Sequence, residues 1–538
     1  MGTSSRRQGA LRRALESVLP VERFGDQRTI LAGTGQSAAG LVVAILATFA
    51  TQVLITRVLG APAFGVVTLA TQGALVLGFF SRVGMDMAAV RRVAIDVGQG
   101  RSDRVRAVVS RASLIAAVAS VAVGGAVFVL AEPLARAFAS GYEARSDAVN
   151  AFRAAALAIP FTALVQVYLG ATRGLKIMRH TLYVFWIGQP LGWLALIGVG
   201  WAVSRSVGAT SLAYAGSWVA ATAWAAWLWR RETRGLGHAP PAAGEVGDLL
   251  RYGAPRAPAA LFSQLLFWTD LFVLAQFVGR AGVSQAEVGI YAAAARAAQV
   301  ILLFIIAVSL MFSPFVADLH ARGERDKLDR LFKQLTRWTM AATLPLFVVL
   351  AVTPGSALRL FGAEFGVGQA ALLILLVGQL ANVATGAVGF VLIMVGRTGW
   401  DLVVYAGSVA LDVAVAVALI PVLGMEGAAV AGAVTMALSK LARLGLVWRF
   451  VRIQPFDRDY LRLAVPTAAG LAAGVAAHLV ARGGAWQADL VATGAAAAAA
   501  YAIALYAAGL PPAEKRAARS LVAVLLRRPT AGGAGPAG

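Results

Sequence analysis

Two ionisable side chains fall within neighbouring apolar stretches of the sequence. These stretches, 254–278 and 288–316, flank a short turn, and each exceeds the ~20 residues that a helix needs to cross a ~30 Å hydrocarbon layer. The first contains Asp270, about 6 Å past the expected bilayer centre, and the second contains Arg296 at a similar depth. A charge at that depth costs at least ~2.5 kcal/mol. We therefore expect Asp270 and Arg296 either to pair with each other or to line a transport pathway.

A third charge, Asp412, lies at the middle of the apolar stretch 401–421 and has no obvious partner nearby in the sequence. Intramembrane carboxylates commonly take part in proton relays and ion pathways. Asp412 is therefore our candidate for the group that couples transport to a cation, either H⁺ or Na⁺.

Other polar residues are candidates for a substrate cavity or a gate. Arg256, Gln264 and Asn382 lie in apolar stretches of the second half of the chain, where they could bind a polar substrate. An arginine that extends towards the lipid headgroups and amides that hold helices together are the alternatives. Arg82 and Asp86 are one helical turn apart and can pair. We interpret them as an inner gate, with a solvated structural pair as the alternative.

Several kinds of chemistry lack their motifs. The chain contains no cysteine, which excludes disulfides, thiolate metal sites and cysteine nucleophiles. Gly-x-x-x-x-Gly-Lys-Ser/Thr does not occur, and the four histidines are scattered singly. Neither a nucleotide cradle nor a metal site is therefore predicted. We expect a transporter without catalytic residues, a bound metal or a cofactor other than the coupling ion.

Composition indicates the elements that position these residues. Hydrophobic residues make up 59% of the chain and charged residues 14%, with a mean hydropathy of +0.74. These values are typical of an all-α polytopic membrane protein. About fourteen transmembrane helices are predicted, at 29–56, 64–84, 107–131, 150–172, 181–203, 209–229, 254–278, 288–316, 338–353, 368–394, 401–421, 427–447, 463–481 and 487–509.

The basic residues indicate an orientation. With fourteen crossings, 34 of the 48 Lys and Arg residues fall on the side of the termini, 7 on the opposite side and 7 within the spans. This asymmetry predicts cytoplasmic termini and a location in the cytoplasmic (inner) membrane, among membrane lipids. The net charge of +22 then reflects topology, and nucleic acid is not an expected partner.

An internal repeat predicts two lobes. Gly65 and Gly289 open corresponding helices 224 residues apart, and Trp229-Arg230 matches Trp448-Arg449 at an offset of 219. Six crossings separate the copies, so the repeats are parallel and predict two six-helix lobes around a central cavity. The expected divisions are a basic cytoplasmic segment (1–28), an N-lobe of helices 1–6 (29–229), a cytoplasmic linker (230–253), a C-lobe of helices 7–12 (254–450), two extra helices (451–509) and a partly disordered cytoplasmic tail (510–538).

Several short motifs resemble a known superfamily. The sequence contains Arg57-Val-Leu-Gly60, then Phe64-Gly65 at the start of the next helix, and Gly84-Met-Asp86 followed by Val90-Arg91. These motifs resemble the oligosaccharide and polysaccharide flippases of the multidrug, oligosaccharidyl-lipid and polysaccharide exporter superfamily. The resemblance covers roughly residues 30–450. Members of that family often carry Asn where this chain has Asp412, so no family detail is transferred to that position.

The resemblance implies a function. It predicts a flippase that moves a polyprenyl-diphosphate-linked oligosaccharide to the outer leaflet by alternating access, for the assembly of a cell-surface polysaccharide such as lipopolysaccharide. Polysaccharide polymerases or glycosyltransferases are the implied protein partners. The alternatives are a multidrug or small-cation antiporter of the same superfamily, a lipid II flippase, and a non-transporting membrane subunit of an envelope-assembly complex.

Overall fold

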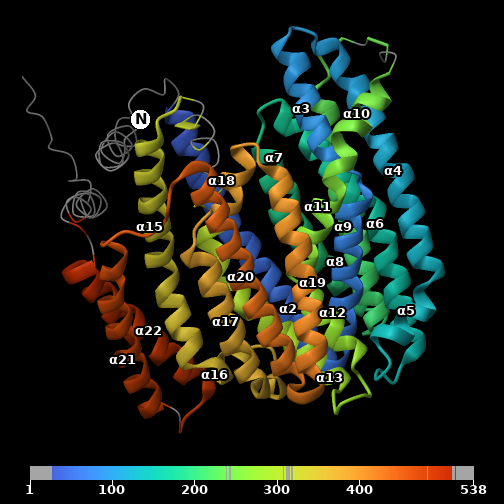
Figure 1. The fold of residues 1–538 in the computed structure, drawn as a ribbon. Helices are drawn as coiled ribbons and strands as arrows, with labels where there is room; N and C mark the ends of the chain where they lie inside the picture. Colours follow the sequence, from blue (N-terminus) through green and yellow to red (C-terminus); the bar gives the residue numbers. More distant parts are fainter. Residues whose placement is uncertain are drawn as a thin grey trace, which may run out of the picture.

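The computed structural model describes residues 27–511 and 515, except 238, 241–243, 307, 310–315, 317–318, 321, 482 and 510. Most of the expected terminal segments, 1–28 and 510–538, therefore lies outside the described residues. The described chain is helical, and a single isolated β-bridge joins Val278 and Val283. The helices run roughly side by side in one bundle, with α3 and α10 together at one end (Figure 1).

The first group of helices spans residues 27–232, and its members pack mainly against one another. Helix α6 is its centre, because it contacts α2, α3, α4, α5 and α9. Residues of the α9 N-terminus are held by Asp147, whose carboxylate accepts hydrogen bonds from the N–H groups of Val207 and Gly208. The helices are α2 (Gln27–Ser81), α3 (Met85–Gly98), α4 (Val105–Val129), α5 (Ala131–Phe138), α6 (Arg145–Gly174), α7 (Arg179–Thr181), α8 (Gln189–Trp201) and α9 (Val207–Glu232).

Helix α2 joins the first two predicted spans. Its backbone leaves helical geometry at Gly60, where φ is +79°, a conformation that favours glycine because a side chain would clash with the backbone. Pro62 follows this break and can be accommodated there because it lies in a first helical turn. The break therefore separates two spans that the sequence predicts as independent helices.

The second group of helices follows the linker helix α10 (Glu245–Gly253), which packs on α3. Its centre is α20, which contacts α12, α13, α17, α18 and α19. The helices are α11 (Ala257–Leu265), α12 (Thr269–Gln276), α13 (Gln285–Gln299), α15 (Arg325–Val352), α16 (Pro354–Leu358), α17 (Gln369–Ala384), α18 (Val388–Met394), α19 (Thr398–Leu423) and α20 (Met425–Val451).

Two further helices, α21 (Ala464–Ala481) and α22 (Trp486–Ala504), pair with each other and pack against α15 at the edge of the bundle (Figure 1). Side chains of α22 fix the position of this pair at two levels, once against α15 and once against α16. The Tyr501 hydroxyl donates to the carbonyl oxygen of Ala341 at 2.9 Å, and the Ser356 hydroxyl donates to the Asp489 carboxylate at 2.6 Å. These helices correspond to the two extra helices predicted after the repeat.

The two groups meet where α2 crosses α13. A methyl group on Gly65 would lie 3.0 Å from the backbone nitrogen of Gly289, and one on Gly289 would lie 1.8 Å from the carbonyl oxygen of Ala61. Only glycine permits this approach of two backbones. Residues 57–65, 139–142, 278–289 and 357–365 surround the crossing, and we call this region the distal seam because it lies at the end of the bundle away from α3 and α10 (Figure 1).

The number of spans differs from the prediction. Among the described residues, eleven helices are long and apolar enough to cross a membrane, or twelve if the bent pair α10–α11 and α12 is one span. Two of the predicted spans are merged in α2. Helix α9, which ends in Arg230, Arg231 and Glu232, is not among the eleven. The all-helical membrane fold is confirmed, whereas the count of fourteen is not.

Candidate functional site

The site begins at a break in a helix. Helices α11 and α12 are bent by 65° across residues 266–268, and Asp270 is the second residue of α12. This position stabilises the Asp270 carboxylate, because the first turn of a helix presents free N–H groups and the positive end of the helix dipole. The Asp270 Oδ1 atom accepts a hydrogen bond of 2.7 Å from the N–H of Leu271. A broken helix within an apolar span thus supports a buried carboxylate.

Asp270 receives its second hydrogen bond from Tyr291 of α13, whose hydroxyl donates to Oδ2 at 2.6 Å. The carboxylate also lies against the backbone of α20, since a methyl group on Gly432 would be 2.3 Å from Oδ2. Asp270 is 6% exposed and Tyr291 is fully buried. Three helices therefore fix the position of one carboxylate.

Asp412 of α19 lies close enough to Asp270 and Tyr291 to interact with both electrostatically. Its side chain is fully buried, and neither carboxylate oxygen has a hydrogen-bond partner among the described residues. Leaving a buried polar group unpaired costs about 1–3 kcal/mol. The structure thus brings together the two acidic residues that the sequence singled out in this half, and no ion pair among the described residues joins either of them to a basic side chain.

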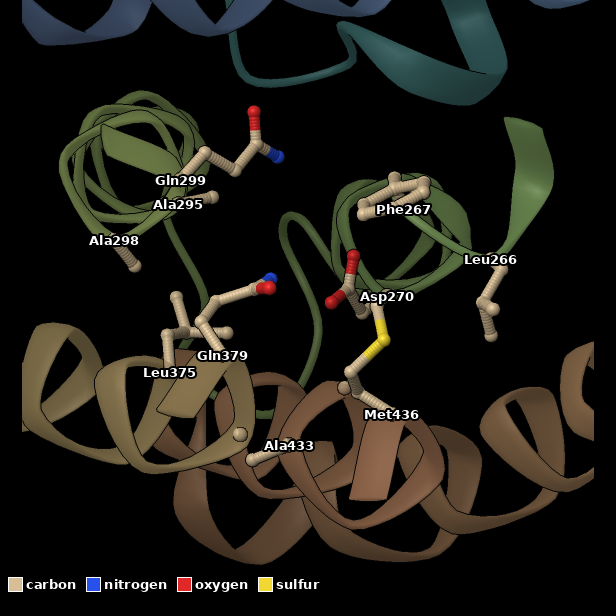
Figure 2. A pocket seen from close by; sticks show the side chains of 12 residues that line it. Leu266, Phe267, Asp270, Ala295, Ala298, Gln299, Leu375, Gln379, Ala433 and Met436 are labelled. Carbon is tan, nitrogen blue, oxygen red and sulfur yellow. The ribbon is translucent and has the colours of Figure 1, made fainter. Parts of the chain in front are cut away.

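A small cavity adjoins Asp270 within the second group of helices (Figure 2). The side chain of Gln379 extends from α17 towards Asp270, and Gln299 of α13 also lines the cavity (Figure 2). Its centre offers about 20 Å³ to a water molecule, which is room for one or two waters or a bare ion and far too little for a sugar. The remaining lining residues are Leu266, Phe267, Ala295, Ala298, Leu375, Gly378, Gly432, Ala433 and Met436.

The predicted contact between Asp270 and Arg296 is not formed. Among the described residues no ion pair joins them, and the Arg296 guanidinium instead lies over the Trp268 ring, 4.3 Å from its centroid. A cation–π contact of this kind stabilises a cation without an acid. The physical reason is the bend before α12, which turns Asp270 towards Tyr291 and α20. The interpretation of Asp270 and Arg296 as a structural ion pair is therefore wrong.

The other candidates lie at different places. Asn382 is buried and donates to the Oε1 atom of Gln379 at 3.1 Å, so it supports the cavity indirectly. Gln264 does not line the cavity, and Arg256 lies near Tyr252 at the start of α11, with 3.4 Å between Nη1 and the tyrosine oxygen. Arg82 and Asp86 belong to the first group, where Nε and Oδ1 are 3.2 Å apart. That pair forms as predicted, while its role as a gate stays a prediction.

A second buried ion pair was missed in the sequence. Arg443 of α20 is 1% exposed, and its Nε donates to the Asp401 carboxylate at 2.8 Å. Its guanidinium lies 3.9 Å from the centre of the Tyr405 ring. The two residues are 42 positions apart, so no local spacing reveals the pair. Tyr291 was missed as a partner of Asp270 for the same reason. One signal could have indicated it, because Tyr291 lies one helical turn before Ala295, which lines the cavity, and therefore on the same face of α13.

Comparisons with known proteins agree with this architecture. The family model "Polysaccharide biosynthesis protein" matches residues 30–320, which is more than half of the chain. A probable low-salt glycan biosynthesis flippase, Agl15 of Haloferax volcanii, is 24% identical over 208 residues, or 38% of this chain and 43% of that protein. The chain thus matches less than half of the length of this curated relative.

Solved structures share the fold at low sequence identity. The lipid II flippase MurJ in an inward closed conformation superimposes with a TM-score of 0.68, at 13% identity, over 87% of this chain and 97% of MurJ. An inward-facing multidrug resistance transporter of the MATE family, in the MOP superfamily, gives a TM-score of 0.64 at 14% identity, over 76% of this chain and 94% of that one. Because the family model matches more than half of its length, this chain belongs to the polysaccharide biosynthesis protein family.

Proposed function

We propose that this protein is a flippase that moves a polyprenyl-diphosphate-linked oligosaccharide between membrane leaflets by alternating access, driven by a cation that binds at Asp270 and Asp412. The substrate class rests on the family match and on the similarity to the glycan flippase. The coupling rests on one observation, two buried acidic side chains of neighbouring helices, of which Asp270 lines a cavity of ionic size.

The charge of this site supports a cation as its ligand. Among the described residues no donor meets hydrogen-bond geometry with either Asp412 oxygen, and the Asp270 carboxylate accepts from the Tyr291 hydroxyl and one backbone N–H. Unpaired carboxylate oxygens in a low-dielectric environment repel each other and bind a cation strongly. Either H⁺ or Na⁺ would neutralise these carboxylates, because both cations bind to oxygen atoms and both fit the cavity.

The glycan requires a different path. A sugar that enters hydrocarbon loses hydrogen bonds at several kcal/mol per hydroxyl, so it needs a polar path much larger than the cavity at Asp270. We place that path between the two groups of helices, where Arg296 lies close to Tyr214 of the first group. Arginine suits the diphosphate of such a substrate, because its guanidinium can donate two parallel hydrogen bonds. Cation binding would then act on the substrate through the relative position of the two groups.

The distribution of basic residues supports a location in the cytoplasmic membrane with both termini in the cytoplasm. The distal seam would then face the outer side. Glycosyltransferases would supply the lipid-linked substrate on the cytoplasmic face, and a polysaccharide polymerase could consume the product on the outer face.

Reconstitution in proteoliposomes tests both parts of the proposal. A fluorescent polyprenyl-diphosphate oligosaccharide is incorporated, and its exposure on each leaflet is followed with a membrane-impermeant quencher under an imposed H⁺ or Na⁺ gradient. We expect the wild type to accelerate translocation in the presence of one of the gradients, and Asp270→Asn to reduce the rate by at least about tenfold because it removes a charged cation ligand. Asp326→Asn, an exposed carboxylate at the start of α15, is the matched control.

Two results would contradict the proposal in different ways. Translocation by Asp270→Asn at the wild-type rate and with the wild-type gradient dependence would remove the coupling role of this site. No translocation of the glycan lipid by the wild type, together with gradient-driven efflux of cationic drugs, would instead favour an antiporter of the multidrug type.

A further inference from the structure

We propose that Arg57 and Glu364 hold the distal seam closed and that the buried amide of Gln285 opposes them, so that these three residues set how readily this side of the protein opens. The inference rests on the proposed alternating-access function, in which the seam must open once in every cycle. It assigns gating residues that do not belong to the lining of the cavity at Asp270.

The closing contacts join the first group of helices to residues that follow α16. The Arg57 side chain donates two hydrogen bonds of 2.9 Å, from Nε to the carbonyl oxygen of Leu360 and from Nη2 to that of Arg359. In the reverse direction, Glu364 Oε1 accepts a hydrogen bond of 2.8 Å from the N–H of Ala61. Each bond includes a charged partner, and such bonds are stronger than neutral ones.

The position of Ala61 explains why its N–H is free to bind Glu364. Gly60 interrupts α2 with its positive φ, and the first N–H groups after such a break lack helical acceptors. The Glu364 carboxylate therefore caps the second segment of α2 from the other group of helices. Separation of the groups would break this cap and both Arg57 bonds together, which makes the three contacts a single latch.

Gln285, the first residue of α13, has the opposite effect on the closed state. It is 3% exposed, and neither its Oε1 nor its Nε2 has a hydrogen-bond partner among the described residues. The turn at Gly141 covers it, since a methyl group on Gly141 would lie 3.3 Å from the Gln285 Cβ atom. Moving this turn away would give the amide access to water. Closure therefore carries the desolvation cost of an unpaired amide, and opening removes it.

The two effects explain how a seam with a tight glycine crossing can still open. The contact of Gly65 with Gly289 and the latch stabilise the closed state, while the unpaired Gln285 amide destabilises it. The free-energy difference between the closed and open states is therefore smaller than the latch alone would produce. A conformational equilibrium can respond to a ligand only if the free-energy difference between its states is comparable to the differential affinity of the ligand. Gln285 would keep that difference small.

Thiol labelling measures opening directly, because the chain has no native cysteine. Val278→Cys places one thiol in the seam, at a residue that is 6% exposed and covered by Gly141. The full-length protein is reconstituted in vesicles without any glycan lipid, and a membrane-impermeant maleimide is added from the side of the seam. The labelling rate then reports the fraction of open protein in Val278→Cys and in each variant made on this background.

The variants should change the labelling rate in opposite directions. Arg57→Leu and Glu364→Leu should each raise it by about tenfold, because each removes charge-assisted bonds of the closed state, and Gln285→Met should lower it severalfold. Arg136→Leu is the matched control, since Arg136 lies at the same end but pairs with Glu132 of its own helix α5. It should leave the rate unchanged.

The opposite sign of the Gln285→Met effect separates gating from simple loss of stability, which would raise labelling in every variant. An unchanged rate in both latch variants, or an increased rate in Gln285→Met, would overturn the proposal. The assay involves neither substrate nor gradient, so such a result would leave the proposed transport of glycan lipids untouched. Conversely, normal gating in a protein that translocates no glycan lipid would contradict the proposed function alone.

Discussion

The interiors of the two groups of helices differ although the sequence repeat relates them. At the offset of 219 residues that matches Trp229 with Trp448, the position of Asp412 corresponds to Trp193. Trp193 is 5% exposed, and its ring packs edge-on against that of Tyr214, which packs against Trp218, at centroid distances of 5.0 and 6.0 Å. The first group thus has an aromatic core where the second has a buried acid and a cavity.

This difference suggests a division of labour. Edge-to-face aromatic pairs add about 0.5–1.5 kcal/mol beyond their area burial, and the Trp193 indole also donates to the carbonyl oxygen of Thr210 at 3.1 Å. An aromatic core of this kind favours a single rigid packing. The unpaired carboxylate of Asp412 destabilises its surroundings and can be neutralised by a ligand. The first group would therefore act as a rigid frame, and the second would respond to the cation.

The largest effect on stability is expected from Trp193→Ala, which removes a buried ring of the aromatic core and its packing against Tyr214. Such substitutions cost about 3–5 kcal/mol, and the melting temperature of the detergent-solubilised protein should fall accordingly. The ion selectivity of the folded fraction in proteoliposomes should stay the same, because Asp270 and Asp412 lie in the other group. A change of the driving ion in this variant would show that the aromatic core also contributes to coupling.

A smaller change in stability, an increase rather than a decrease, is expected from Asp412→Leu. Replacing a buried and unpaired polar group by an apolar one should raise the free energy of unfolding by about 1–3 kcal/mol, while gradient-driven translocation should be lost. Thermal unfolding and the proteoliposome assay together check this trade of activity for stability. A lower melting temperature would mean that Asp412 has a stabilising partner and would remove the contrast with Trp193.

The smallest effect on stability is expected from Gly432→Ala. This substitution adds one methyl group to α20, at 2.3 Å from the Asp270 Oδ2 atom. Displacement of the carboxylate should weaken its hydrogen bond with Tyr291, with a cost of about 1–2 kcal/mol and an altered dependence of the transport rate on cation concentration. Gly445→Ala is the matched control on the same helix, because a methyl group there meets no atom of a described residue within 4 Å. Equal behaviour of the two variants would indicate that Asp270 has space to move without consequence.

Much of the fold could be predicted because its signals are local. Apolar stretches identify membrane helices from composition alone, and the break at Gly60 follows from a glycine next to a proline-containing turn. The sequence repeat also identified Gly65 and Gly289 as equivalent residues, and the structure brings these two backbones together. The repeat could not predict that the equivalent glycines touch, because it relates positions and does not specify the distance between the lobes.

The acidic residues of the site were predicted, whereas their partners were not. Asp270 and Asp412 stand out in the sequence because a charge is costly in an apolar span. Of the two alternatives for Asp270 and Arg296, the ion pair is not formed, because the bend between α11 and α12 directs the carboxylate towards Tyr291. Hydropathy carries no information about the direction of a side chain at a helix break, so the partner could not be derived from it.

The sequence alone determined that the chain is built from apolar membrane helices and which charges they carry, because both depend on the cost of moving each residue out of water. The tertiary structure decided which of those charges meet, since Asp412 and Asp270 are 142 positions apart and lie together only where α19 packs on α12. It also decided that Arg57 and Glu364, which are separated by more than half of the chain, close the same seam. Contacts between distant residues depend on how helices pack, and packing is a property of the whole bundle.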